Sequence, residues 1–271
     1  MFRFLFTRRW LGLLLAVLVI GTACVELGLW QFRRYAERQD ANDRIGANLR
    51  AAPVPLDQVM SRSAPPDVDE EWRVVTATGR YDVENQIAVL YRTRDGAPGV
   101  DVVAPLRTSS GSAVLVDRGW VATTGNGNDV GALPKPPSGT VTVTGWVRRN
   151  ADPGSETTPN GSTVRAISSD AVQAVVPYPL YDGFLDLTGE RPVVHPRPAT
   201  TPPPDLGSGP HFFYGLQWFF FALLALGFWC YFAWTEYRQQ PRDSLPPARS
   251  QRPGAASVDR QHRAGDVAGR R

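Results

Sequence analysis

The residues best suited to chemistry are a histidine and two aromatic side chains at the start of an apolar run. His211 is followed by Tyr214 and Trp218 in the stretch HFFYGLQWFFFA, which opens the apolar residues 211–234. A neutral imidazole in aromatic, apolar surroundings is a natural axial ligand for haem iron. The alternative interpretation is an interfacial histidine that merely begins a helix after Pro210.

Glu26 is a second polar residue within an apolar run. It lies seven residues before Arg33, which is about 10 Å along a helix at 1.5 Å per residue. Such a carboxyl group usually faces a partner or a protein interior, and Glu26 shares a helix face with Trp30, four residues on. The alternative is a protonated or snorkelling side chain near the interface.

The sequence gives no support for catalysis. It contains no GxSxG, HExxH or P-loop motif, and no GxGxxG after a strand. Cys24 and Cys230 both fall in apolar runs, so we expect neither an extracytoplasmic disulfide framework nor a cysteine metal site. His195 lies in a proline-rich connector and is expected to be a solvated loop residue.

Two apolar runs are long enough to cross a membrane. Residues 10–30 contain a single charge and residues 212–234 contain none, whereas a bilayer core requires about 20 helical residues. We expect transmembrane helices over 10–32 and 211–234. The first run is longer than the apolar core of a signal peptide and lacks a convincing cleavage site, so an uncleaved anchor is favoured.

Charge divides the chain into three parts. Residues 1–34 carry a net charge of +4, residues 35–234 of −5 and residues 235–271 of +4, which sum to the formal +3. Basic ends favour both termini in the cytoplasm and an extracytoplasmic middle, and nothing resembles a nucleic-acid surface. A composition of 28 arginines and one lysine suggests a GC-rich bacterial genome, hence a bacterial plasma membrane.

The middle of the chain, residues 33–210, predicts a β-rich domain after an initial helix that ends before Pro53. Short runs with two-residue periodicity alternate with turn residues. The expected strands are 72–82, 86–94, 100–108, 113–123, 140–149, 162–168 and 184–189, and a short helix is expected over 168–176. The fold class is therefore a membrane protein in which two transmembrane α-helices flank a mostly antiparallel β (α+β) extracytoplasmic domain, with a disordered cytoplasmic tail over 235–271.

Three stretches together resemble the Surfeit-locus family of cytochrome c oxidase assembly factors. LGLWQFRR (27–34) is similar to the family's Gly-x-Trp-Gln-x-x-Arg. GRYD (79–82) followed by residues 99–121 is similar to a block that ends in Val-x-Arg-Gly-Trp/Phe-Val. HFFYGLQWFFFA (211–222) is similar to His-x-x-Tyr-x-x-x-Trp-x-x-x-Ala. Two positions depart from the pattern, since Gly209-Pro210 replaces an Asn before the His, and Asp117 stands where Asn is common.

The resemblance implies a non-enzymatic role in maturing subunit I of an aa-type oxidase, with haem a as a transient cofactor. His211 becomes the candidate ligand of the haem iron. Tyr214, Trp218 and Trp30, with Phe212, would supply aromatic walls. Arg118, or Arg33 and Arg34, would pair with the propionates.

The partners that the resemblance implies are subunit I, membrane lipid and, further, a haem a synthase. The main alternative is a haem-free membrane scaffold that stabilises an oxidase assembly intermediate. A haem-modifying oxidoreductase and a generic two-span anchor fit the sequence less well. For Arg118-Gly119-Trp120 a structural interpretation competes, in which Gly119 relieves crowding at a strand bend and Trp120 packs in the core.

Overall fold

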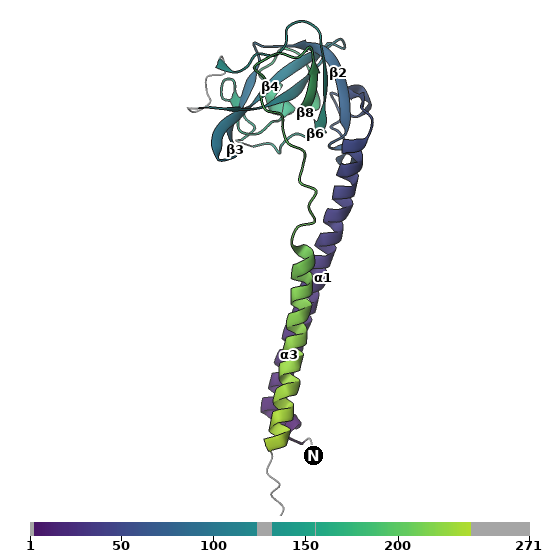
Figure 1. Cartoon of the computed structure of the whole chain (residues 1–271), viewed down its shortest axis with the longest axis vertical. Helices are drawn as coiled ribbons and strands as arrows, with labels where there is room; N and C mark the ends of the chain where they lie inside the picture. Colours follow the sequence, from purple (N-terminus) through teal and green to yellow (C-terminus); the bar gives the residue numbers. More distant parts are fainter. Residues whose placement is uncertain (1–2, 124–131, 155, 240–271) are drawn as a thin grey trace, which may run out of the picture. The chain divides into compact units, whose positions relative to one another are not determined.

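The computed structural model describes residues 3–123, 132–154 and 156–239. Two long helices, α1 and α3, and a sheet domain between them in sequence make up the described chain (Figure 1). The chain divides into two compact units, Ala23–Phe220 and the residues on either side of that range. Most of the expected cytoplasmic tail, from residue 240 on, lies outside the described residues.

Helix α1 (Arg8–Arg50) joins the expected span and the expected helical extension into one element. It ends three residues before Pro53, consistent with the expected stop. Helix α3 (His211–Gln239) begins directly after Pro210. Both helices are long and apolar enough to cross a membrane, judged by length and composition.

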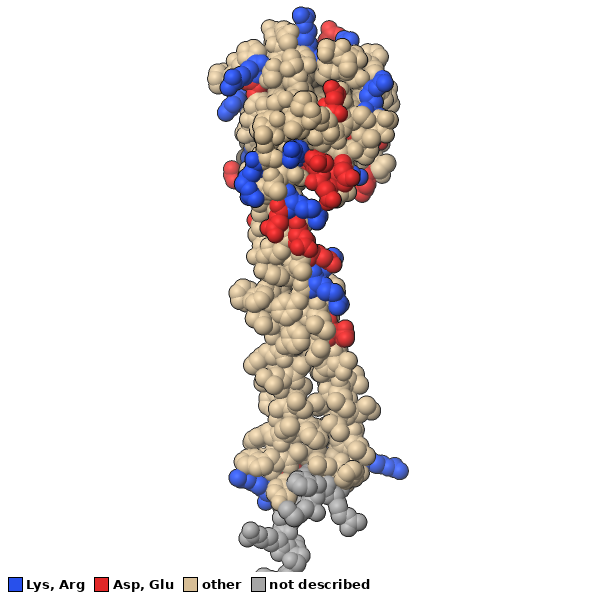
Figure 2. Space-filling model, turned by 90° about the vertical axis from the view of Figure 1, so that its right-hand side faces the viewer, with Lys and Arg blue, Asp and Glu red and all other residues tan. Residues whose placement is uncertain are grey.

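The two helices present an uncharged surface over much of their length, whereas charged side chains gather on the sheet domain and the adjoining part of α1 (Figure 2). In the unit outside Ala23–Phe220, Trp10 of α1 and Trp229 of α3 meet edge to face, with ring centroids 6.2 Å apart. The chain thus carries two candidate membrane helices that pair through aromatic contacts.

The sheet has eight strands in the spatial order β1-β2-β6-β8-β5-β4-β3-β7. Their bounds are β1 Val54–Pro55, β2 Val74–Tyr81, β3 Ile87–Arg94, β4 Ala97–Thr108, β5 Ala113–Ala122, β6 Val141–Arg148, β7 Thr163–Val164 and β8 Leu180–Arg191. Five pairings are antiparallel and three are parallel. The sheet is therefore mixed, although antiparallel pairing predominates as expected.

An additional pairing of β2 with β4 closes five strands into a ring, β2-β6-β8-β5-β4. Gly79 makes the closure possible, because a Cβ there would lie 2.8 Å from the backbone carbon of Arg107. The strands β1, β3 and β7 lie outside the ring and extend the sheet from it. The ring is a small closed barrel whose interior must be filled by side chains.

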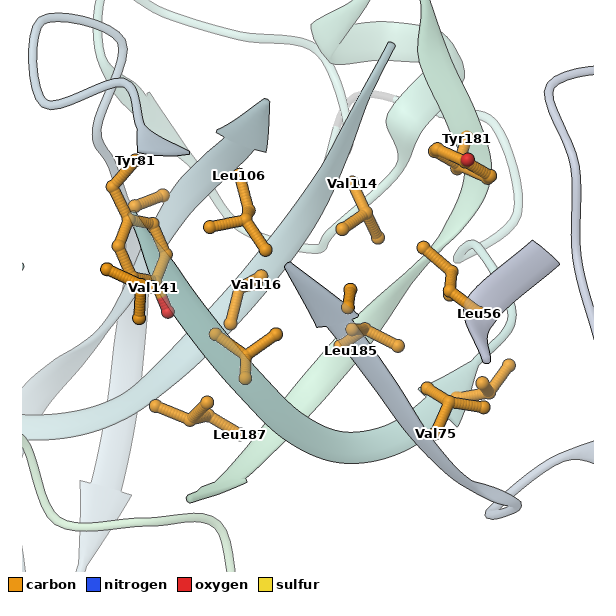
Figure 3. Packing of buried hydrophobic residues seen from close by; sticks show 14 of the residues in the cluster. Leu56, Val75, Tyr81, Leu106, Val114, Val116, Val141, Tyr181, Leu185 and Leu187 are labelled. Carbon is orange, nitrogen blue, oxygen red and sulfur yellow. The ribbon is translucent and has the colours of Figure 1, made fainter. Parts of the chain in front are cut away.

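The interior of the ring holds one hydrophobic cluster, to which every ring strand contributes. Val75, Leu106, Val116 and Leu185 point toward one another, and Leu56 covers one side (Figure 3). A second cluster lies against the other face of β3, β4 and β5. Strand β5 is consequently buried on both faces, which explains its continuous apolar run AVLV.

Some expected elements differ in length. The strand expected over 162–168 is the two-residue β7, and the strand expected over 184–189 extends over Leu180–Arg191. The helix expected over 168–176 is the single turn α2, Ser169–Val172. Ser168 is its N-cap residue but its side chain makes no capping bond; Asn150 accepts from the Ser169 N–H instead, at 2.8 Å.

Gly119 lies where the proline-rich connector crosses β5. The connector residue Ala199 exchanges two backbone hydrogen bonds with Trp120, each 2.8 Å long. Gly119 has a φ of +116°, and a Cβ there would collide with the carbonyl group of Ala199. Gly119 thus relieves crowding, as expected, but Trp120 is only half-buried and donates its indole N–H to the carbonyl oxygen of Arg92, at 3.1 Å.

We predict that Gly119→Ala lowers the free energy of unfolding by at least about 3 kcal/mol, because backbone strain adds to displacement of the connector. The matched control is Gly111→Ala. Gly111 also has a positive φ, +81°, but open space surrounds its would-be Cβ, so we expect a loss of about 1–2 kcal/mol. Urea unfolding, followed by tryptophan fluorescence, measures the free energy of unfolding of both variants. Equal losses of stability would contradict the conclusion that Gly119 is needed where the connector crosses β5.

Candidate functional site

His211 and Gln31 join the first turn of α3 to α1. The Nδ1 atom of His211 lies 2.8 Å from Oε1 of Gln31. In the tautomer that donates from Nδ1 to this oxygen, Nε2 keeps its lone pair. A hydrogen bond of this kind fixes the tautomer and orientation of histidines that ligate metals. The histidine is thus held with one nitrogen engaged and the other able to act as a ligand.

Two glycines on the facing helices admit the aromatic rings that pack beside this pair. A Cβ on Gly28 would lie 2.7 Å from the ring of Phe219, and one on Gly215 would lie 3.1 Å from the ring of Phe32. The Phe32 ring lies 5.9 Å from the rings of both Phe219 and Phe212, between centroids. The absence of side chains at Gly28 and Gly215 therefore creates an aromatic layer next to His211.

The connector reaches α3 along the part of α1 that follows Arg34. Arg38 donates to the carbonyl oxygen of Gly207 at 2.6 Å, and Asn42 donates to that of Leu206 at 2.8 Å. Gly209, with a φ of +66°, lies between Arg38 and His211. A Cβ on Gly209 would lie 3.7 Å from Nε of Arg38 and 3.5 Å from Cδ2 of His211. Arg38 is thus a cation beside the histidine, which the motif did not single out.

The predicted aromatic residues lie on these two helices. Tyr214 and Trp218 follow His211 at spacings of three and seven, which places them on one side of α3. Tyr214 is 49 % exposed and Trp218 is half-buried. Trp30, 46 % exposed, adjoins Gln31 in sequence but points about 100° away from it around α1. Glu26 is exposed, so no protein interior covers it within the described chain.

Sequence reasoning missed part of this group. Gln31 was named only as one residue of the Gly-x-Trp-Gln-x-x-Arg motif, and its contact with His211 joins residues 180 positions apart. Phe32 and Phe219 were not singled out. The available signal was the helical spacing of Gly28, Phe32 and Tyr35 on one face of α1.

Arg118 does not belong to the group around His211. Its side chain is fully buried in the sheet domain, where it lies 3.5 Å from the carboxylate of Glu190. It also donates to the carbonyl oxygen of Pro134 at 2.8 Å and lies over the ring of Tyr81, 5.6 Å from its centroid. A guanidinium enclosed in this way has no open path to a propionate.

Of the expected cations, Arg33 and Arg34 are exposed on α1, and Arg34 pairs with Glu37 at 3.0 Å.

A charged cleft of about 590 Å³ lies elsewhere in the sheet domain. Three of its carboxyl groups, those of buried Asp117 and Asp186 and of half-buried Asp101, have raised pKa values. Burial raises the pKa of Asp117 well above its usual range, and neighbouring Asp101 and Asp186 raise it further. Burial also raises the pKa of Asp101 and of Asp186, although Arg92 and Arg148 oppose it. Arg92 contacts Asp101 at 2.9 Å and Arg148 contacts Asp186 at 2.7 Å, so the cleft largely pairs its own charges.

Comparison with known proteins connects these features to a family. The chain matches the SURF1 family over residues 18–223. It belongs to the SURF1 family. It is 32 % identical to an uncharacterized SURF1-like protein of Mycobacterium tuberculosis over 252 residues, which cover 90 % of this chain and 92 % of that protein. It is 31 % identical over 115 residues to the cytochrome oxidase assembly protein SHY1 of Saccharomyces cerevisiae, covering 41 % of this chain and 28 % of SHY1.

The SURF1 match includes the three motifs quoted above and the Gln31–His211 pair. The matched range also includes Asp117, which stands at a motif position where Asn is common in the family. Oδ1 of Asp117 accepts a hydrogen bond from the Gly119 N–H at 2.9 Å. Burial, which raises the pKa of this carboxyl group, favours its neutral form, and a neutral carboxyl group resembles an asparagine amide in size and charge. The departure is conservative once burial is considered.

We predict that Asp117→Asn makes stability less dependent on pH. A carboxyl group whose pKa is higher in the folded than in the unfolded state favours folding at low pH, and stability falls as pH rises above its unfolded value. Asn keeps the acceptor for the Gly119 N–H without the ionisable proton. The free energy of unfolding of Asp117→Asn should therefore match the wild type near pH 4 and exceed it at pH 8.

Asp117→Ala is the control for this prediction. It leaves the buried Gly119 N–H without an acceptor, so we expect a loss of about 1–3 kcal/mol at both pH values. Urea unfolding at pH 4 and pH 8 measures all three proteins. A pH dependence of Asp117→Asn as steep as that of the wild type would contradict a raised pKa at this position.

Proposed function

We propose that this SURF1-family protein assists the assembly of an aa-type cytochrome c oxidase by holding haem a for subunit I. The similarity to SHY1, a cytochrome oxidase assembly protein, supports the role in assembly. The observation that carries the haem-handling part is the contact of His211 with Gln31 beside an aromatic layer. In this proposal the protein supplies a binding and positioning site rather than a catalyst.

The residues at the start of α3 fit the chemistry of a haem. His211 would hold the iron through Nε2, because Gln31 engages Nδ1. Phe212, Tyr214 and Trp30 have exposed aromatic side chains, which would contact the macrocycle and the farnesyl tail. Arg38, with Arg33 and Arg34 on the same helix, would supply cations for the propionates. When bound, haem a would supply the iron, and the protein's part is to hold and orient it.

The proposal includes a location. The two apolar helices are consistent with membrane anchoring. Two spans require both termini on one side, and the basic ends favour the cytoplasm. The sheet domain would then face the outside of a bacterial plasma membrane, near subunit I and a haem a synthase.

We predict that the full chain, co-expressed with haem a biosynthesis enzymes and purified in detergent, carries haem a detectable in its visible spectrum. His211→Ala should abolish the signal, because it removes the iron ligand. Gln31→Ala should weaken haem affinity by about 10–100-fold, the usual effect of removing the partner of a metal-ligating histidine. His195→Ala, an exposed histidine of the connector, should bind like the wild type. A colourless wild-type protein would contradict haem handling and favour the haem-free scaffold.

We predict that deleting the gene lowers aa-type oxidase activity in isolated membranes, and that the wild-type chain restores it. If haem handling is the function, His211→Ala restores much less activity at equal protein level, whereas His195→Ala restores it fully. Equal restoration by both variants would show that the chain acts in assembly without its histidine. No loss of activity on deletion would contradict the assembly role.

A further inference from the structure

Two arginines lie directly opposite each other where the ring of strands closes. The pairing of β2 with β4 consists of Gly79 with Thr108, Arg80 with Arg107, and Tyr81 with Leu106. Directly opposite residues of an antiparallel pair project on the same face. Tyr81 and Leu106 belong to the interior cluster, so the two arginines project from the outer face of the ring.

This arrangement is unfavourable as it stands. Like charges directly opposite on neighbouring strands destabilise the pair, and this seam joins only three residue pairs. Neither guanidinium takes part in an ion pair among residues 3–123, 132–154 and 156–239. Arg107 lies over the ring of Tyr178, 4.9 Å from its centroid, which orients its guanidinium without neutralising it.

The surroundings of the pair suit an anion. Arg80 and Arg107 line a cleft of about 480 Å³ together with Gly79 and four hydroxyl-bearing residues, Thr78, Thr108, Ser109 and Thr140, and no acidic residue is part of this lining. Both arginines are exposed and therefore accessible. The charged cleft described above, in contrast, pairs its arginines with its own carboxylates.

We propose that Arg80 and Arg107 form a binding site for an oxyanion of the phosphate class. Guanidinium groups match such oxygens through two parallel N–H···O bonds, and hydroxyl groups add neutral donors. The cleft is larger than a phosphate ion, so it accepts either free phosphate or the phosphate group of a small ester such as a lipid headgroup. A bound anion would neutralise the repulsion across the seam and thereby stabilise the closed ring. This site is independent of the haem proposal.

The test uses the full chain in a phosphate-free, non-ionic detergent. Inorganic phosphate is titrated at constant ionic strength set with sodium chloride. Binding is followed by broadening of the phosphate ³¹P resonance and by the rise in thermal midpoint. We expect saturable binding of phosphate to the wild type. The dissociation constant should be at least about tenfold larger for Arg80→Gln and for Arg107→Gln, since each variant loses charged hydrogen bonds to the anion.

Arg165→Gln is the matched control. Arg165 is an exposed arginine of the same domain that lies over the ring of Tyr91, so its loss changes the net charge equally but should leave phosphate binding unchanged. In the absence of phosphate, Arg80→Gln should be at least as stable as the wild type, because the repulsion is removed. This result also shows that the variant folds.

Glycerol 3-phosphate, the phosphate part of a lipid headgroup, distinguishes the source of the anion. Tighter binding than inorganic phosphate assigns the site to phosphate esters, and equal binding assigns it to free phosphate. No saturable binding by the wild type at millimolar concentrations of either anion would overturn the proposal. Equal binding by the wild type and Arg80→Gln would overturn it as well.

Discussion

The short pairing of β2 with β4 is the contact on which the rest of the sheet domain depends. It joins three residue pairs, yet it turns an open, mixed sheet into a ring with an enclosed interior. The closure depends on Gly79, whose missing side chain lets the two backbones approach. The first half of β4 pairs with β3, and the end of β4 pairs with β2. The sheet therefore closes because one strand changes partners along its length, and the ring strands have no open edge at the seam.

The interior of the ring is not wholly apolar. Arg118 and Glu190 are both buried and lie 3.5 Å apart, and the hydroxyl group of Tyr81 donates to Glu190 at 3.3 Å. Burial, together with the negative charge of Glu190, raises the pKa of Tyr81, so its proton is retained in this network. Buried ion pairs contribute little net stability, but removing one partner is costly because it leaves an uncompensated charge. Glu190 lies on β8 and Arg118 on β5, so the network also links two ring strands.

Within the unit Ala23–Phe220, hydrogen bonds fix the proline-rich connector between the ring of strands and His211. Ala199 pairs with Trp120 on β5, and residues 206 and 207 accept hydrogen bonds from Asn42 and Arg38 of α1. The connector contains seven prolines between residues 191 and 210, which limit its backbone freedom and remove donors that would otherwise need partners. His211 therefore begins α3 at a position that side chains of α1 determine.

Local pattern was sufficient for much of this protein. The apolar runs predicted both long helices, because length and hydrophobicity are properties of a single segment. Two-residue periodicity placed the six longer strands that lie between residues 72 and 191, although β8 proved longer than expected and β7 much shorter. The motifs predicted the family, and they singled out His211, whose role in binding haem stays a proposal.

Pairing between distant segments was decided only by the tertiary structure. The parallel pairing of β5 with β8 and the closure by β2 and β4 depend on register between distant strands, which no single segment encodes. The same holds for the contact of Gln31 with His211 and for the burial of Arg118, which the sequence analysis had offered as a cation for the propionates. An arginine in a motif appears charged and accessible from sequence, and only the packing around it determines whether water or a ligand reaches it.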